Sequence, residues 1–419
     1  MKLTIVGGGS TYTPELIDGF ARMRDLLPIE EVWLVDPNPE RLALVAGVSQ
    51  RMFARAGHPG RIIPTSDVVA GVSDADAVLL QLRIGGQDAR RGDETWPHEV
   101  GCIGQETTGP GGFAKALRTV PVVLEVADLV RKHAKPDAWI IDFTNPVGIV
   151  TRALLEAGHR AVGLCNVAIG FQRNFARMFD VAPERVSLGH VGLNHLTWER
   201  SVSVDGVDRL PGLLADDLPR LAEEVDLPAH LIELLGVVPS YYLRYYYAHD
   251  EVLHEQLGSP TRADAVQEVE RRLLELYADP TVDEKPAELA KRGGAFYSEA
   301  AVDLISSLVS DRGDVQVVNL RNDGSLPFLP DDHVIEVPAR VTAAGLVAEP
   351  IAALDDDIRG LISAVAGYER LALDAAVHGG RDRVLRAMQA HPLVLQYDRA
   401  EKLTDLLLDH NRRHLAWAK

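Results

Sequence analysis

The chain has 419 residues, of which 46% are hydrophobic, so it can form one large domain or two joined domains with substantial cores. Its net charge of −18 argues against nucleic acid or an anionic membrane surface as a partner. Two cysteines indicate no disulfide framework, and no apolar run is long enough to span a bilayer. We therefore expect a cytoplasmic protein with no membrane partner.

The start of the chain predicts a strand, a glycine turn and a helix. Residues 3–6 are apolar, and the glycines of 7–9 follow at once. Thr13 is expected to cap the helix, with Pro14 in its first position. Such a turn brings backbone N–H groups to the pyrophosphate of a dinucleotide, although Tyr12 stands where the usual motif has its third glycine. A turn without a ligand is the alternative. The candidate cofactor-binding residues are Gly7, Gly8, Gly9, Ser10 and Thr11.

A second predicted strand ends in an acid, Asp36. A carboxylate at this place typically binds the ribose hydroxyls of NAD. It would also repel the 2′-phosphate of NADP, so the sequence favours NAD. The alternative is that Asp36 only begins a turn with Pro37.

Strands and helices alternate up to about residue 170, which predicts an α/β, Rossmann-like doubly wound sheet in a first domain, 1–170. A loop with glycine and arginine, 83–91, follows a buried strand, at the edge where an open α/β sheet binds ligands. A second glycine-rich loop spans 104–112. The expected strands and helices are 31–36, 39–56, 62–63, 77–82, 113–133, 138–144, 147–157 and 161–164.

The pattern changes in the remaining residues, 171–419, which we expect to form an α+β domain for substrate, metal and oligomer contacts. The last predicted strand is stopped by Pro338. The two domains are expected to share an interface with the site between them. The expected segments are irregular strands in 186–204, helices in 207–290, strands at 314–320 and 333–337, a helix at 351–378 and two closing helices.

Some side chains with useful chemistry have ordinary structural explanations as well. Cys165 and His195 together suit a borderline divalent cation, but no short metal motif joins them. Their spacing alone favours a core cysteine and a hydrogen-bonded histidine. The tyrosine run at 241–247 also fits aromatic packing on a helix, and Arg90 and Arg262 also fit solvated charges.

Together, these segments resemble the family 4 glycoside hydrolases, and specifically their 6-phospho-β-glucosidase branch. The resemblance covers nearly the whole chain in order, and its motifs are specific as a set. The resembling stretches are 5–16, 104–109, 144–146, 164–167, 192–195, 242–246, 291–294 and 322–325.

The resemblance implies a reaction that depends on NAD and on a divalent metal, usually manganese. It implies hydrolysis of 6-phospho-β-glucosides such as cellobiose 6-phosphate, with oxidation of the sugar at C3 and removal of the C2 proton by a tyrosine. The aglycone then leaves from C1, water adds, and the hydride returns. This scheme differs from the pair of carboxylates used by most glycosidases.

The resemblance also implies residue roles. Cys165 and His195 resemble the metal ligands, and Tyr242 resembles the base, with Tyr241 as an adjacent candidate. Asn166 stands where the α-glycosidase branch usually has an acidic aspartate, so it resembles the β branch and leaves the leaving-group acid unidentified. Ala168 stands where the family commonly has proline. The implied substrate-binding residues are Arg90, Asn145, Asn166 and Arg262, and Arg83 is added as a cofactor-binding candidate.

Three other readings stay open. The same machinery could act on an unphosphorylated or α-linked glycone. A plain NAD-dependent 2-hydroxy-acid dehydrogenase would also have a Rossmann half, but would not need Cys165, His195 and Tyr242 together. A non-catalytic NAD-binding regulator would bind without turnover. The resemblance further implies a homo-oligomer, a dimer or a tetramer.

Overall fold

The computed structural model describes residues 1–293 and 296–418, and within them the strands form one 13-stranded sheet. Gly294, the last residue of the 291–294 stretch, lies outside the described residues. Among the described residues, no helix is both long and apolar enough to cross a membrane.

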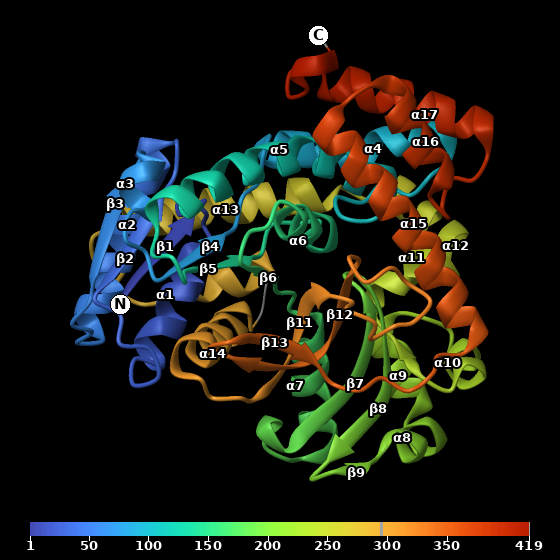
Figure 1. The fold of residues 1–419 in the computed structure, drawn as a ribbon, viewed down its shortest axis with the longest axis horizontal. Helices are drawn as coiled ribbons and strands as arrows, with labels where there is room; N and C mark the ends of the chain where they lie inside the picture. Colours follow the sequence, from blue (N-terminus) through green and yellow to red (C-terminus); the bar gives the residue numbers. More distant parts are fainter. Residues whose placement is uncertain (294–295, 419) are drawn as a thin grey trace.

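The N-terminal half of the sheet is parallel and has the spatial order β3-β2-β1-β4-β5-β6. This is the order of the dinucleotide-binding Rossmann fold, so the predicted fold class is confirmed. The central strands of this half are buried along their whole length because helices cover both faces of the sheet (Figure 1). The strands are β1 (Lys2–Val6), β2 (Glu31–Val35), β3 (Arg61–Thr65), β4 (Ala77–Leu80), β5 (Trp139–Asp142) and β6 (Ala161–Gly163).

Helices connect these strands and continue beyond the last of them. They are α1 (Thr13–Arg22), α2 (Pro39–Arg55), α3 (Val68–Val72), α4 (Gly86–Thr95), η1 (Trp96–Val100), α5 (Gly109–His133), α6 (Val147–Glu156), α7 (Val167–Phe179) and η2 (Pro183–Arg185).

The second half of the chain adds antiparallel strands to the same sheet. β11 joins β6 through Asn319 opposite Gly163, and β12, β7, β8 and β10 follow outward from β11. The sheet is therefore continuous across residue 170, and a domain boundary there stays a prediction. The strands are β7 (Val186–Leu193), β8 (Leu196–Val204), β9 (Val207–Asp208), β10 (Val238–Pro239), β11 (Val315–Arg321), β12 (Val334–Thr342) and β13 (Gly345–Ala348).

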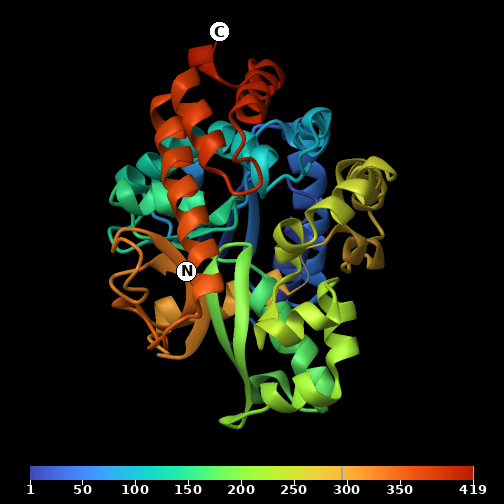
Figure 2. The same ribbon diagram turned by 90° about the vertical axis from the view of Figure 1, so that its right-hand side faces the viewer.

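Helices of the second half return to the first half. α13 packs on α2 and α4, α14 packs on α1, and α15 and α17 pack on α5 (Figures 1 and 2). The elements are α8 (Leu210–Asp216), α9 (Leu218–Val225), α10 (Ala229–Leu235), η3 (Tyr241–Leu243), α11 (Arg244–Tyr247), α12 (His249–Leu257), α13 (Arg262–Ala278), η4 (Ala287–Arg292), α14 (Tyr297–Ser310), α15 (Asp356–His378), α16 (Arg381–Ala390), α17 (Tyr397–Asn411) and η5 (Ala416–Ala418).

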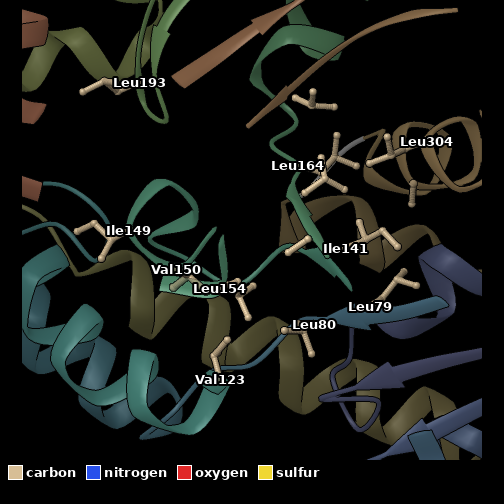
Figure 3. Packing of buried hydrophobic residues seen from close by; sticks show 14 of the residues in the cluster. Leu79, Leu80, Val123, Ile141, Ile149, Val150, Leu154, Leu164, Leu193 and Leu304 are labelled. Carbon is tan, nitrogen blue, oxygen red and sulfur yellow. The ribbon is translucent and has the colours of Figure 1, made fainter. Parts of the chain in front are cut away.

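One hydrophobic cluster runs through both halves. Leu79 and Leu80 of β4, Ile141 of β5 and Leu304 of α14 belong to it (Figure 3). Burial of such side chains is the main favourable contribution to folding. Because the core is shared, the two halves support one another.

Two predicted helix starts are wrong. The loop predicted at 104–112 ends early, because α5 begins at Gly109, with a proline in its first turn. A Cβ at Gly111 would collide with backbone oxygens of Asp93 and Gln105, so this glycine serves close packing rather than a flexible loop. The helix predicted at 351–378 is α15, which begins at Asp356, because Arg200 donates hydrogen bonds to the carbonyls of Ala352 and Ala353 just before it.

Two local predictions are also corrected. β12 continues through Pro338. Its pairing with β7 occurs at Glu336, so Pro338 needs no N–H for that pairing, and the Pro338 carbonyl accepts a hydrogen bond from the N–H of Glu349. Thr13 is the first helical residue rather than the cap, and its hydroxyl donates to the carbonyl of Gly8 instead of capping the helix.

Candidate active site

A cavity of about 1110 Å³ opens at the carboxyl ends of β1 and β4. This is where the strand order of the sheet reverses, which is the usual ligand site of a doubly wound sheet. Residues of α4, α13 and η4 form its other walls. The predicted site residues that line it are Gly7, Gly9, Ser10, Asp36, Arg83, Arg90, Asn145, Asn166, His195, Tyr242 and Arg262.

Three predicted site residues do not line this cavity. A Cβ at Gly8 would lie 2.8 Å from the Cα of Leu34, so Gly8 faces β2. Thr11 is buried, and its hydroxyl accepts from Arg292 at 3.1 Å. Cys165 lies just behind the wall and lines a second cavity, of about 800 Å³.

The glycine turn has the shape that a dinucleotide requires. Gly7 has φ +88, and a Cβ there would lie 2.7 Å from the carbonyl oxygen of Gln81. A Cβ at Gly9 would lie 2.8 Å from the Asp36 carboxylate, which accepts from the Gly9 N–H at 3.1 Å. The Asp36 carboxylate therefore lies at the cavity mouth beside the glycine turn. These residues fit NAD, because a turn with larger side chains would block the approach of the pyrophosphate.

His195 is held as a neutral imidazole with one nitrogen available. Its Nδ1 lies 2.9 Å from the Thr107 hydroxyl, which donates its own proton to Gln105 at 2.8 Å. The hydroxyl must then accept from Nδ1–H, so Nε2 carries the lone pair. Burial lowers the pKa of His195 to about 4, which keeps the ring neutral at pH 7. This arrangement fits a metal ligand.

Tyr242 stacks on His195, with ring centroids 3.6 Å apart and an interplanar angle of 6°. Burial raises the pKa of Tyr242 well above its usual value, with the buried Cys165 as a further cause. The structure therefore brings Tyr242 next to His195 and near Cys165, although the three residues lie far apart in the sequence. The adjacent Tyr241 is 42% exposed and accepts from Arg244, away from the cavity wall.

The Cys165 thiol is embedded among polar groups. Burial raises its pKa and the Glu336 carboxylate raises it further, whereas the nearby side chains of Asn194 and Tyr297 lower it. Within the described residues, no cluster of three or more His, Cys, Asp or Glu side chains could hold a metal. Cys165 and His195 would therefore be a two-ligand set, which leaves positions open for substrate or water.

The cavity wall carries a cluster of cations around one acid. Glu106 forms an ion pair with Arg83 and accepts from Lys115 at 2.7 Å, and Arg90 Nη1 lies 3.2 Å from it. Burial opposes ionisation of Glu106, but these three cations outweigh burial and hold its pKa well below the usual range. Burial lowers the pKa of Lys115 to about 8, although Glu106 opposes this shift. The wall is therefore positively charged where it meets His195.

Glu94 joins the two arginines that the sequence analysis assigned to the substrate. Arg90 Nε donates to Glu94 Oε1 at 2.6 Å, and the N–H of Ala263 donates to Glu94 Oε2 at 2.8 Å. Ala263 follows Arg262, which begins α13 and donates to the Lys291 carbonyl. The ion pair thus brings Arg90 and Arg262 to one wall, although they lie far apart in the chain.

Several residues that line the cavity were not predicted from the sequence. Glu106 and Arg292 lie in stretches 104–109 and 291–294, which resemble the family 4 glycoside hydrolases, so their place in the sequence could have indicated a role in the site. Glu270 carried no signal, because α13 has the charged composition of a surface helix. It is nevertheless the buried partner of Arg292 at 3.0 Å and of Arg41 at 3.3 Å. Further cavity residues not foreseen are Lys115 and Tyr297.

The chain matches models of a known protein family along most of its length. A model described as family 4 glycosyl hydrolase matches residues 2–181, and a model of the C-terminal domain of the same family matches residues 190–394. The chain belongs to family 4 of the glycosyl hydrolases. Its resemblance to that family is therefore confirmed.

Individual relatives of this family 4 glycosyl hydrolase are similar over almost their whole length. A probable 6-phospho-beta-glucosidase of Bacillus subtilis is 40% identical, over 99% of this chain and 97% of the relative. The 6-phospho-beta-glucosidase of Escherichia coli is 36% identical, over 98% and 96%. A solved structure of the Thermotoga maritima 6-phospho-beta glucosidase with manganese, NAD⁺ and glucose-6-phosphate has a TM-score of 0.93, at 36% identity and 99% coverage of each chain.

Proposed function

We propose that this protein hydrolyses 6-phospho-β-glucosides, such as cellobiose 6-phosphate, with NAD and a divalent cation, Mn²⁺ or a similar ion, as cofactors. Three findings support the proposal. The chain belongs to family 4. Two relatives, one named as a 6-phospho-β-glucosidase and one as a probable 6-phospho-β-glucosidase, match it over nearly their full length. A similar structure holds manganese, NAD⁺ and glucose-6-phosphate.

One observation carries most of the proposal. The stacked pair of His195 and Tyr242 lies on the wall of the same cavity as the glycine turn and Asp36. A dehydrogenase acting on a hydroxy acid would need the glycine turn but no tyrosine stacked on a metal ligand. The arrangement therefore favours a sugar oxidised and deprotonated at neighbouring carbons.

Bound NAD⁺ and a divalent cation supply a hydride acceptor and a Lewis acid, which side chains lack. Asp36 would bind the adenosine ribose, and Cys165 with His195 Nε2 would hold the cation. Tyr242 Oη would take the proton from C2 of the sugar. Burial disfavours the Tyr242 phenolate, and Arg90 opposes this effect by its positive charge.

The 6-phosphate is assigned to the wall that carries Arg90 and Arg262. A guanidinium binds a phosphate through paired N–H groups, so two arginines brought together by Glu94 suit this anion. Asn145 would orient the sugar hydroxyls. Asn166 supports the β linkage, because it cannot act as the acid found at this position in the α branch.

The decisive experiment measures nitrophenol release from 4-nitrophenyl β-glucoside 6-phosphate after NAD and metal have been removed. We expect release only when NAD⁺ and Mn²⁺ are both added back, with no net formation of NADH. The unphosphorylated and α-linked compounds run beside it and decide between the glycones. If nitrophenol is released from either of these compounds as fast as from the phosphorylated β-glucoside, or faster, the proposed substrate is wrong.

Two other outcomes would contradict the glycosidase proposal itself. NADH that accumulates on a 2-hydroxy acid, without nitrophenol release, would establish the dehydrogenase alternative. Binding of NAD without any turnover would favour a regulator. Location in the cytoplasm and a homo-oligomeric state, a dimer or a tetramer, are further parts of the proposal, and the native mass in solution tests the second.

A further inference from the structure

The loop that carries His195 is the tip of a tight hairpin. Leu193 of β7 pairs with Leu196 of β8, so the tip consists of Asn194 and His195 alone. His195 has φ +62, in the left-handed region that a residue with a side chain rarely adopts. Such a conformation persists only where neighbouring groups fix it. The neighbours of this tip therefore decide where the imidazole points.

The buried carboxylate of Glu336, in β12, accepts a hydrogen bond from the hairpin tip. Glu336 is 1% exposed, and its Oε2 accepts from the side-chain amides of Asn194 and Asn319, each at 2.8 Å. Its Oε1 lies 3.0 Å from Nε2 of His190. Both carboxylate oxygens are thus engaged, and one of them is bonded directly to the residue before His195.

The cluster around Glu336 carries excess negative charge. His190 lies between Glu336 and Glu199, whose Oε1 is 2.5 Å from its Nδ1. Burial alone lowers the pKa of His190, but the two carboxylates outweigh burial and raise the pKa to about 10. One imidazolium between two carboxylates leaves a formal charge of −1. A buried uncompensated charge is costly, so this cluster favours a cation nearby.

Glu336 is connected to the proposed metal ligands through Asn194. Asn194 directly precedes His195, and its side chain donates a hydrogen bond to Glu336 at 2.8 Å and lies near Cys165.

We propose that Glu336 is a positioning residue for the divalent-cation site, fixing Asn194 and thereby the His195 tip while placing a buried negative charge behind Cys165 and His195. This inference rests on the proposed function, because it takes those two side chains as the metal ligands. Groups behind metal ligands orient them and tune their affinity, and their loss typically weakens metal binding by about 10- to 100-fold.

The test is titration of the metal-free, full-length protein with Mn²⁺ alone, followed by calorimetry or by the electron paramagnetic resonance of free Mn²⁺. We expect Glu336→Gln to weaken Mn²⁺ binding by about 10- to 100-fold. Glu199→Gln is the matched control, because Glu199 touches His190 but neither the hairpin tip nor Cys165. It should weaken Mn²⁺ binding less than Glu336→Gln does, because it removes one negative charge from the cluster but leaves the hydrogen bond between Glu336 and Asn194 intact.

Two further variants keep the test decisive. Asn194→Ala removes the hydrogen bond between Glu336 and the hairpin tip but keeps the carboxylate, so it should also weaken Mn²⁺ binding. If circular dichroism shows that Glu336→Gln does not fold, the Mn²⁺ affinity of Asn194→Ala tests the proposal in its place. Wild-type affinity in Glu336→Gln and Asn194→Ala, with weakened binding in Cys165→Ser, would overturn this inference alone. Wild-type affinity in Cys165→Ser as well would overturn the metal site of the proposed function.

Discussion

At the scale of single residues, the Thr107 hydroxyl decides which nitrogen of His195 can bind a metal. Its proton goes to Gln105, so it can only accept from Nδ1–H of His195. We expect Thr107→Val to weaken Mn²⁺ binding by about 10-fold or more, as for other groups behind metal ligands. Thr107→Ser keeps the hydroxyl and should retain affinity. Equal Mn²⁺ affinity in both variants would show that the hydroxyl does not set the tautomer.

The choice between two neighbouring tyrosines is also made at this scale. Tyr242 lines the cavity and stacks on His195, whereas Tyr241 is 42% exposed and bonded to Arg244. Loss of a general base typically costs about 100-fold or more in turnover. We expect this loss in Tyr242→Phe and near wild-type turnover in Tyr241→Phe, measured with the nitrophenyl substrate. The reverse result would assign the base to Tyr241.

At the scale of elements, the hairpin of β7 and β8 links stability to pH through His190. The pKa of His190 is about 10 in the folded protein, against 6.5 for an ordinary histidine. Its stabilising contribution is therefore complete below pH 6.5 and is lost as pH rises towards 10. Glu199→Gln removes one of the two carboxylates that raise this pKa, so the variant should lose less stability over this range.

Urea unfolding at several pH values between 6.5 and 10 measures this effect. The difference in free energy of unfolding between wild type and Glu199→Gln should be largest at pH 6.5 and should shrink towards pH 10. A difference that stays constant with pH would mean that His190 does not titrate in this range. The comparison with the variant cancels the contributions of other titrating groups.

At the scale of the whole molecule, contacts between the halves favour one cooperative unit. Glu270 of α13 binds Arg41 of α2, and Arg51 donates to the carbonyls of Tyr277 and Val282. We expect calorimetry to give one unfolding transition, which saturating NAD⁺ shifts upward. At 100 times the dissociation constant, binding adds about 2.7 kcal/mol of stability. Two transitions, of which NAD⁺ shifts only one, would indicate independent domains.

The fold class and eleven of the residues that line the cavity could be predicted from the sequence. Strand, glycine turn and helix at 1–16 follow from short-range preferences, because a Gly-Gly-Gly turn before Pro14 allows few other structures. Asp36 could be placed for the same reason, since it directly follows a buried strand. Asn145 and Arg83 lie just after the ends of β5 and β4, which a doubly wound sheet gathers at one edge, and Arg90 lies in helix α4, which follows β4.

The tertiary structure alone decided how distant residues meet. The closeness of Cys165, His195 and Tyr242 depends on strands of the second half joining the first sheet, and no local pattern encodes such pairing. Glu270 and Glu336 look like surface acids in the sequence, yet each is buried among cations or amides from other elements. Long-range contacts fix these partners, because burial is rewarded only once the complete fold has brought them together.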